Sequence, residues 1–462
     1  MNFDLTVKQI LEICSGTLFC GDENIICQTY SKDTRILKPG DTYVGIKGEK
    51  FDGNSLYKDA FNKGANCCIL EKGSFIKDEN YLYDKPIILV NDTILALKEI
   101  ATFIRNESDA IFIGVTGSVG KTSTRDMIYS IVSKKYKSLK TEGNYNNNIG
   151  LPLTLMRIKD EKCAVIEMGM NNLGEIDYLT NITKPHIAVI TNVGTAHIGN
   201  LGSRENILKA KLEIKKGLVA NGTLIINNDN DLLHSYYLNN PDKILTIGID
   251  NQSDVMAKDI EINASSAIFT ITFQDNEYKV ECPVPSISFV YNSLTAFAVG
   301  VLTNISPAKI IEGIKDFKLT DNRLEIIDSK SNIHIINDSY NASLDSMKSS
   351  LQILKNSKGK RKIAVLGSML ELGDYSKKLH EEIGQSVVEN NIDILITVGD
   401  DAKYIASKAH ELNMNTNNIY TFNNNNDAIN KLKTILESDD TVLIKASHGL
   451  KFIEIVNALK NI

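Results

Sequence analysis

The chain has 462 residues, which is too long for one hydrophobic core and predicts roughly three domains. Its net charge of −6 excludes a protein-wide basic field, so we expect no nucleic-acid partner. The seven cysteines include no C-x-x-C pair, which predicts reduced thiols in a cytoplasmic protein. Because there is no leader-like N-terminus and no apolar run near ~20 residues, we expect a cytoplasmic protein without stable membrane insertion. We also expect a monomer.

Residues 1–105 predict a small α/β domain of their own. Short β-like runs alternate there with turn residues, and the region has no phosphate loop. The expected strands are residues 42–46, 67–70 and 86–90.

Residues 106–320 predict a central domain in which strands and helices alternate. Apolar runs suited to buried parallel strands are residues 110–115, 163–166, 187–190 and 223–226. Helical patterns include residues 123–133 and 204–217, and a β-rich stretch (267–273 and 278–281) precedes a helix near 293–303. Alternation of this kind predicts a doubly wound sheet with ligands at the carboxyl ends of its strands.

Residues 321–462 predict a second, smaller α/β domain without a phosphate loop. The alternation resumes there, with strands expected at residues 362–366, 392–398 and 442–444. The chain as a whole is therefore expected to hold three α/β domains.

A glycine-rich turn follows the strand expected at 110–115 and precedes a helix. Backbone N–H groups at such a helix start bind phosphate oxygens, so the turn predicts an ATP or GTP site. Lys121 would reach the β- and γ-phosphates and Thr122 would hold Mg²⁺. The spacing departs from G-x-x-x-x-G-K-[ST], because Val115 stands five residues before Gly120. The loop residues are Gly117, Ser118, Val119, Gly120, Lys121, Thr122 and Ser123.

Three further side chains are candidates for the same site. Glu167 ends the strand at 163–166, where a carboxylate commonly faces the Mg²⁺ of a phosphate loop. His197 follows the strand at 187–190, and either a structural role or a metal role fits it, since Mg²⁺ prefers oxygen ligands. Lys211 and Glu213 fit the charged, solvent-facing side of an amphipathic helix.

Together these segments resemble the ATP-dependent Mur ligases of peptidoglycan synthesis. The family's loop has the form Thr-Gly-Ser/Thr-x-Gly-Lys-Thr, which accounts for the spacing found here. The resemblance extends to Glu167-Met168-Gly169, to residues 192–197, to the asparagine-rich segment 141–152, and to residues 337–342 and 367–373. Near the N-terminus, Asp33-Thr34-Arg35 and residues 48–53 resemble the family's UDP-sugar domain.

The resemblance implies a UDP-substrate domain (1–105), a central ATP-binding domain (106–320) and a Rossmann-like ligase domain (321–462). It implies ATP as a substrate, Mg²⁺ held by Thr122 and Glu167, and a second Mg²⁺ near His197. It also assigns Lys211 as a carbamylated lysine whose carbamate would supply an anionic oxygen ligand. The implied partners are UDP-N-acetylmuramoyl-tripeptide and D-alanyl-D-alanine.

Binding roles follow from the same resemblance. The adenine and ribose would be held by Asn292, Arg323 and Asp338. The remaining substrate-binding candidates are Asp33, Thr34, Arg35, Asn146, Asn147, Tyr340 and Asn341.

The chain departs from the family's pattern at three places. Ser286 to Asn292 stands where the family has G-x-H-N-V-x-N, so Ser288 and Phe289 replace a His-Asn pair. Asn322 replaces a glycine before Arg323, and His448 replaces an arginine. An imidazole is smaller than a guanidinium and is not permanently charged, so contacts at position 448 are expected to differ.

Two alternatives remain open at this point. One is another amide ligase of the superfamily, such as a different Mur ligase or a folylpolyglutamate synthetase. Asn146, Asn147 and the Asp33-Thr34-Arg35 segment argue against it. The other is a regulatory P-loop NTPase, which has no evident need for a second α/β domain or for the His197 and Lys211 sites.

Overall fold

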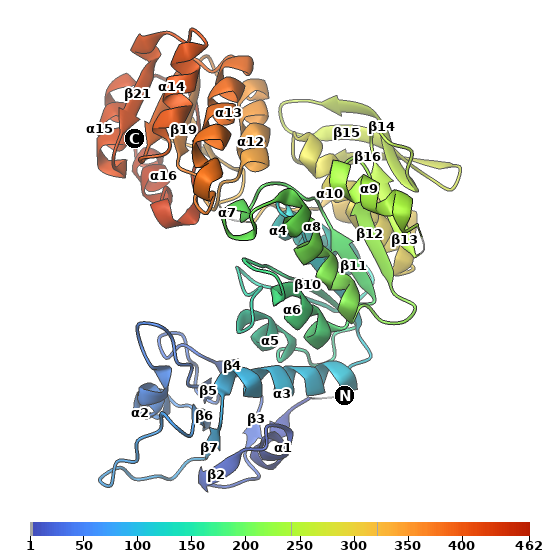
Figure 1. Ribbon diagram of the computed structural model, residues 1–462, viewed down its shortest axis with the longest axis vertical. Coiled ribbons are helices and arrows are strands. Elements are labelled where there is room, and N and C mark those ends of the chain that lie inside the picture. The colour runs from blue at the N-terminus through green and yellow to red at the C-terminus, as the bar shows by residue number, and fades with distance from the viewer. Residues whose placement is uncertain (1–2, 242, 321) are drawn as a thin grey trace.

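The computed structural model describes residues 3–241, 243–320 and 322–462 and confirms a three-part α/β fold (Figure 1). The N-terminal part lies at one end, the central part in the middle and the C-terminal part at the other end. The expected boundary residue 321 lies outside the described residues.

The N-terminal part is built on a five-stranded sheet in the order β2-β7-β6-β5-β4, in which only β2 is antiparallel to its neighbour. Its strands are β2 Thr17–Cys20, β4 Tyr30–Ser31, β5 Thr42–Val44, β6 Cys67–Glu71 and β7 Ile87–Val90. A short pair, β1 Leu5–Thr6 and β3 Ile26–Cys27, lies beside it. The helical segments are α1 Val7–Ile13, η1 Gly53–Leu56, α2 Tyr57–Asn62 and α3 Thr93–Glu107.

Helix α3 fixes the N-terminal part to the central one. Its N-cap residue is Asp92, whose carboxylate accepts hydrogen bonds from the backbone N–H groups of Ile94 and Leu95. At its other end Arg105 donates to the carbonyl oxygens of Thr183 and Lys184, at 2.5 and 2.6 Å. Since these oxygens terminate another helix and have no partner within it, Arg105 ties the two parts together.

The central part is a nine-stranded sheet in the order β16-β15-β14-β13-β12-β11-β8-β10-β9. Its strands are β8 Ile111–Thr116, β9 Ser138–Lys140, β10 Cys163–Glu167, β11 Ile187–Ile190, β12 Thr223–Asn227, β13 Ile244–Gly248, β14 Val255–Ile262, β15 Ala267–Phe273 and β16 Asn276–Cys282. Strands β8 to β14 pair in parallel, whereas β15 and β16 are antiparallel additions at the edge. The expected β-rich stretch therefore extends the nucleotide-binding sheet.

Helices cover both faces of this sheet (Figure 1). They are α4 Lys121–Val132, α5 Gly150–Leu155, α6 Glu175–Thr183, α7 Ile198–Leu201, α8 Arg204–Leu212, η2 Glu213–Gly217, α9 Asp231–Asn239, α10 Ile287–Leu302 and α11 Pro307–Lys315. Helix α10 is apolar along most of its length and largely buried against the sheet and α4. Burial on several sides fits its composition, because a helix without a polar face has no stable solvent-facing position.

The C-terminal part is a six-stranded sheet in the order β17-β18-β22-β19-β20-β21, antiparallel only at β17. The strands are β17 Glu325–Asp328, β18 His334–Asn337, β19 Lys362–Gly367, β20 Ile394–Val398, β21 Ile419–Phe422 and β22 Thr441–Lys445. The helical segments are α12 Leu344–Asn356, η3 Gly373–Tyr375, α13 Ser376–Glu389, α14 Lys403–Glu411, η4 Thr416–Asn418, α15 Asn425–Ile435, η5 His448–Leu450 and α16 Ile453–Lys460. Parallel strands connected by helices give the expected Rossmann-like fold.

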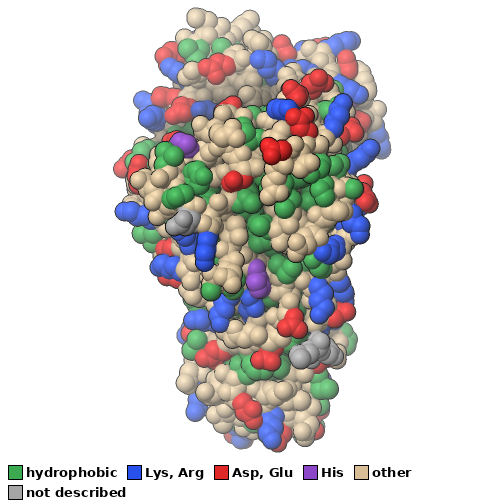
Figure 2. All heavy atoms as spheres, turned by 90° about the vertical axis from the view of Figure 1, so that its right-hand side faces the viewer, with side chains coloured by type: hydrophobic (Ala, Val, Ile, Leu, Met, Phe, Trp, Pro, Cys, Tyr) green, Lys and Arg blue, Asp and Glu red, His purple; other side chains and the backbone are tan. Residues whose placement is uncertain are grey.

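Lysine and arginine are interspersed with aspartate and glutamate on the face that Figure 2 shows, so no field of one sign forms there. Among the described helices, none combines the length and the apolar character that crossing a membrane requires.

Candidate active site

The glycine-rich turn between β8 and α4 has the geometry of a phosphate loop. Gly117 has no room for a side chain, because a Cβ there would lie 1.8 Å from Thr191 Oγ1. Gly120 has φ 82°, a left-handed conformation that favours glycine, at the start of α4. Ser118 and Val119 donate their backbone N–H groups to Asn192, at 3.0 and 2.9 Å. The loop is therefore held in place by the segment that follows β11.

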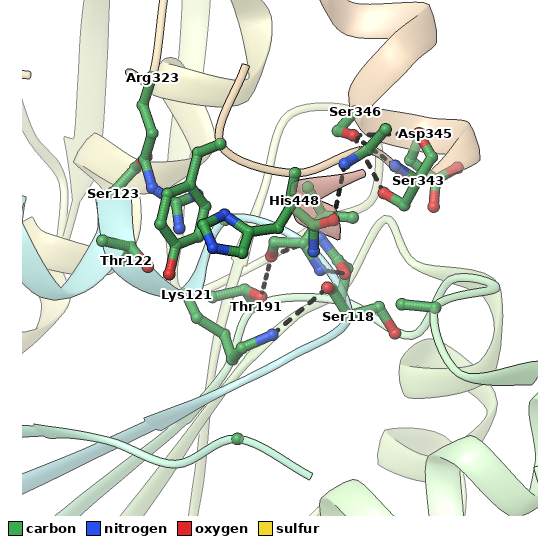
Figure 3. Close-up of a pocket in the computed structure, with 18 of the residues that line it drawn as sticks. Ser118, Lys121, Thr122, Ser123, Thr191, Arg323, Ser343, Asp345, Ser346 and His448 are labelled. Atoms are coloured by element: carbon green, nitrogen blue, oxygen red, sulfur yellow. Dashed lines mark hydrogen bonds between the residues drawn. The ribbon is translucent and has the colours of Figure 1, made fainter. Parts of the chain in front are cut away.

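Lys121 lies inside this loop (Figure 3). Its ammonium donates to the carbonyl oxygen of Gly117 at 2.8 Å and is 3.4 Å from that of Ser118. Burial lowers the pKa of Lys121, with Glu167 opposing the shift and Arg323 adding to it. A lysine tethered to carbonyl oxygens within the loop is placed to exchange them for phosphate oxygens.

Glu167 and Thr122 meet at the ends of β10 and the phosphate loop. Thr122 Oγ1 donates to Glu167 Oε2 at 3.0 Å, and Arg125 and Asn146 donate to the same carboxylate at 3.1 and 2.8 Å. Glu167 is only 2 % exposed. The Thr122 hydroxyl and the Glu167 carboxylate together offer hard oxygen ligands of the kind that Mg²⁺ prefers.

His197 lies on the far side of the loop, directly before α7. Its Nδ1 is 2.6 Å from Glu371 Oε2 of the C-terminal part, although the two groups do not align as a hydrogen bond. Burial lowers the pKa of His197 and the charge of Lys121 adds to the shift, whereas Glu371 opposes it. The imidazole is thus placed near both lysines of the site.

The prediction that Lys211 and Glu213 face solvent is wrong. Lys211 is 1 % exposed, and burial together with the nearby charge of Lys121 holds its pKa well below the usual value. Glu213 accepts hydrogen bonds from the backbone N–H groups of Gly174 and Asp177 and so caps α6. The alternation of charged and apolar residues gave a wrong prediction because it carries no information on which segments pack against that side of α8.

The opposite wall of the cleft comes from the C-terminal part. Asp338 follows β18 and receives hydrogen bonds from the ammonium of Lys445 and the hydroxyl of Ser350. Lys445 also donates to the carbonyl oxygen of Asn341 at 3.0 Å. Asp338 and Lys445 are buried, so each side chain offsets the cost of burying the other's charge.

Arg323, Tyr340 and His448 form a stack at the edge of the cleft. The guanidinium carbon of Arg323 is 4.1 Å from the centre of the Tyr340 ring, and the His448 ring centre is 5.4 Å from it. Arg323 and His448 are labelled in Figure 3, where Ser343, Asp345 and Ser346 at the start of α12 lie on the other side of His448. A cation and two rings in contact offer a surface suited to a flat ligand group.

These walls enclose one cleft of about 590 Å³ between the central and C-terminal parts. The expected site residues that line it are Ser118, Val119, Gly120, Lys121, Thr122, Ser123, Asn146, Asn147, Glu167, His197, Asn292, Arg323, Asp338, Tyr340 and Asn341. Gly117 and Lys211 are not among the lining residues, and Lys211 is buried.

The expected UDP-binding residues lie elsewhere, in the loop after β4. Arg35 Nη2 contacts Asp33 Oδ2 at 2.6 Å, and these hydrogen bonds lower the pKa of Asp33 to about 2. The Arg35 side chain is 84 % exposed, whereas Thr34 is buried. The three residues are not brought to the cleft and belong to a separate surface of the N-terminal part.

Two departures from the family pattern have a local explanation. Asn322 has φ 62°, a left-handed conformation that asparagine tolerates better than most residues, so it can replace a glycine. Ser288 Oγ lies 2.7 Å from Ser286 Oγ and 3.3 Å from Ser349 Oγ, which places a contact between α10 and α12 where the family has histidine.

Several side chains of the cleft were missed in the sequence. Thr124 Oγ1 donates to Asn292 Oδ1 at 3.0 Å, and Glu371 contacts His197. Arg125 and Lys445 partner the two buried carboxylates. For Glu371 the only signal was its place in the segment 367–373, and that segment by itself does not predict a contact with another domain.

The fold and the cleft together define a P-loop ligase of three α/β domains, and the comparisons with known proteins agree. The model of the Mur ligase middle domain matches residues 115–300, and that of the Mur ligase glutamate ligase domain matches residues 322–448. The chain belongs to the Mur ligase family and is an ATP-dependent ligase.

Similar proteins cover nearly the whole chain. A UDP-N-acetylmuramoyl-tripeptide–D-alanyl-D-alanine ligase of Bacillus subtilis is 37% identical over 98% of both chains. The ligase of that name from Escherichia coli K12 is 32% identical over 99% of this chain and 98% of its own. Among solved structures, MurF from Acinetobacter baumannii has a TM-score of 0.87 at 28% identity over 99% of both chains. MurF ligase from Thermotoga maritima, solved with ADP, has a TM-score of 0.80 at 26% identity over 94% of this chain and 97% of its own.

Proposed function

We propose that this chain joins D-alanyl-D-alanine to UDP-N-acetylmuramoyl-tripeptide, with ATP converted to ADP and phosphate in the presence of Mg²⁺. Two relatives of that name align with nearly the whole chain. The observation that carries the proposal is the cleft in which a phosphate loop faces polar groups of a second α/β domain. Such a cleft brings a nucleotide and an acceptor together away from water.

The proposed reaction has two steps. The terminal carboxylate of the tripeptide attacks the γ-phosphorus of ATP, the bond to the ADP oxygen breaks, and an acyl phosphate forms. The amine of D-alanyl-D-alanine then attacks the acyl carbon, phosphate leaves and the amine loses a proton. Lys121 and the backbone N–H groups of the loop stabilise the negative charge of the transferring group.

The oxygen ligands of Thr122 and Glu167 are proposed to hold Mg²⁺, which would neutralise phosphate charge. Arg125 and Asn146 keep the Glu167 carboxylate oriented for this role. His197 and Lys211 are proposed to serve a second metal position beside the same loop.

Lys211 is proposed to act as a carbamate. Its lowered pKa favours the neutral amine, whose nitrogen can bond to the carbon of CO₂ with loss of a proton to water. The carbamate places an anionic oxygen ligand where the protonated lysine would repel Mg²⁺.

The nucleoside and substrates are proposed to take the remaining residues. Asn292, Arg323 and Asp338 would hold adenine and ribose, and Asn146, Asn147, Tyr340 and Asn341 would line the path of the peptide. Asp33, Thr34 and Arg35 would hold the UDP group on the N-terminal part. The chain is proposed to work as a monomer, which size-exclusion chromatography with light scattering can test.

A coupled assay of ADP release tests the proposal. The chain is mixed with ATP, Mg²⁺ and UDP-N-acetylmuramoyl-tripeptide, and each of several D-dipeptides is added in turn. Release of ADP that requires both the tripeptide and D-alanyl-D-alanine is expected. Release without any acceptor would instead favour a regulatory NTPase, and release with another amino acid would favour a different amide ligase.

A further inference from the structure

A short contact joins the central and C-terminal parts beside the cleft. The backbone N–H of Gly199, in α7, donates to the carbonyl oxygen of Glu371 at 3.1 Å, and Tyr375 Oη donates to the carbonyl oxygen of Gly202 at 2.9 Å. A Cβ at Gly199 would lie 2.7 Å from Glu371 O and 2.8 Å from Gly373 N. The backbones therefore approach as closely as glycine allows. We call this contact, formed by α7 and η3, the α7–η3 latch.

Two strained residues face each other at the root of the latch. His197 directly precedes α7, Glu371 stands two residues before η3, and both have φ 64°. A left-handed backbone is unfavourable for such side chains and persists only where surrounding contacts hold it. His197 Nδ1 and Glu371 Oε2 are 2.6 Å apart. The strained backbone on each side thus accompanies a close side-chain contact across the domain boundary.

The His197–Glu371 pair lies where it can affect the proposed reaction. Both side chains line the cleft that holds the phosphate loop, and the charges of Lys121 and Lys211 act on the imidazole. Glu371 belongs to the C-terminal part, so it reaches His197 only when α7 and η3 are in contact. If the two parts separate, His197 loses the carboxylate that orients its ring.

We propose that Glu371 is a positioning residue that orients His197, and that the α7–η3 latch makes this orientation depend on closure of the C-terminal part. The phosphate site of the central part is then complete only when the C-terminal part is docked against the central part. This inference rests on the proposed function for its kinetic consequence and for the metal role of His197, whereas the effect on domain docking is independent of it.

The variants Glu371→Ala, Glu371→Gln and Tyr375→Phe test the proposal. Glu389→Gln is a matched control, because Glu389 is an exposed glutamate on the same domain, in α13. Tyr420→Phe controls for Tyr375→Phe, since Tyr420 Oη donates to the carbonyl oxygen of Asn417 within the C-terminal part. Thermal unfolding of each variant, compared with its control, separates loss of folding from loss of positioning.

Two measurements do not require turnover. The first is Mn²⁺ binding in the presence of ADP, followed by electron paramagnetic resonance. Glu371→Ala is expected to weaken it about tenfold, because partners that orient a metal ligand typically contribute that much, and Glu371→Gln is expected to weaken it less. The second is small-angle X-ray scattering, in which Tyr375→Phe and Glu371→Ala are expected to increase the radius of gyration.

The kinetic measurement separates positioning from substrate binding. Glu371→Ala is expected to lower kcat about tenfold and leave KM for the UDP substrate unchanged. Tyr375→Phe, which removes one hydrogen bond, is expected to lower kcat about threefold. Mn²⁺ binding, scattering and kcat that match the control variants would overturn the proposal. Absence of ligation by the unsubstituted chain would overturn the proposed function instead, and the binding and scattering results would still decide on the latch.

Discussion

Glu167 and Asp338 are both buried carboxylates at strand ends facing the cleft, yet their surroundings differ. Glu167, on the central sheet, receives a threonine hydroxyl that is itself a good cation ligand. Asp338, on the C-terminal sheet, is paired with the ammonium of Lys445. Glu167 also has a cationic partner, since Arg125 Nη1 donates to its Oε2 at 3.1 Å, but it lies beside Thr122 of the phosphate loop, so we propose that the central carboxylate is the one that joins a metal site. We propose that the difference divides the cleft into a metal half around Glu167 and a nucleoside half around Asp338, to which Asn292 of the central domain also contributes.

The largest expected effect comes from removing the cation of the phosphate loop. Lys121→Ala is expected to lower tripeptide-dependent ADP release by about a thousandfold, because charge on the transferring phosphoryl group loses its fixed partner. The coupled ADP assay measures it, and Lys135→Ala is the control, because Lys135 is an exposed lysine three residues beyond the end of α4. Retained turnover would remove the phosphate-loop assignment.

Lys211→Ala tests whether the metal half depends on a carbamate. A loss of about a hundredfold in kcat is expected, since an anionic ligand disappears from the site. Added short carboxylates should restore part of the activity. Lys209→Ala is the control, because Lys209 is exposed two residues earlier on α8. A loss that no carboxylate restores, or no loss, would contradict the carbamate.

Glu167→Gln and Asp338→Asn compare the two halves directly. Glu167→Gln is expected to raise the Mg²⁺ concentration for half-maximal activity at least about tenfold, because a charged oxygen ligand is lost. Asp338→Asn is expected to leave that concentration unchanged and to raise KM for ATP. It should also lower the unfolding temperature, since Lys445 remains buried without its counter-charge. Equal Mg²⁺ dependence in the two variants would abolish the proposed division.

Arg35→Ala extends the comparison to the N-terminal part. We expect KM for the UDP substrate to rise about tenfold, as a charged hydrogen-bond donor to the substrate is lost, while KM for ATP stays the same. Steady-state kinetics with each substrate varied in turn measure both constants, with Lys38→Ala as the control. A parallel rise in both would place the UDP site elsewhere.

The smallest effect is expected at Thr124, which lies behind the nucleoside half. Its hydroxyl holds the side-chain oxygen of Asn292, which leaves the amide N–H₂ group available to a purine. Thr124→Val should raise KM for ATP about threefold to fivefold without changing kcat, because one hydrogen bond is lost. Thr124→Ser should restore KM for ATP. An unchanged KM in Thr124→Val would show that the Thr124–Asn292 hydrogen bond does not support nucleotide binding.

Local pattern was sufficient for much of the central domain. The strand expected at 187–190 is β11 as observed, and the one at 163–166 is one residue shorter than β10. Apolar runs of four to six residues between turn signals are shorter than a typical helix and suit buried parallel strands, so their place follows from length and composition. The phosphate loop could also be predicted from local sequence, because its glycines form a turn between a recognisable strand and a recognisable helix.

The sequence by itself determined the fold class, the phosphate loop and, through shared motifs, the family. Only the tertiary structure decided that Lys211 is buried, that Lys445 pairs with Asp338 and that Glu371 meets His197. The Lys445–Asp338 contact joins residues that are 107 positions apart in the sequence, and the Glu371–His197 contact joins residues that are 174 positions apart. Burial and pairing of charges depend on which surfaces pack together, and a local pattern of charged residues looks the same in solvent and in a cleft.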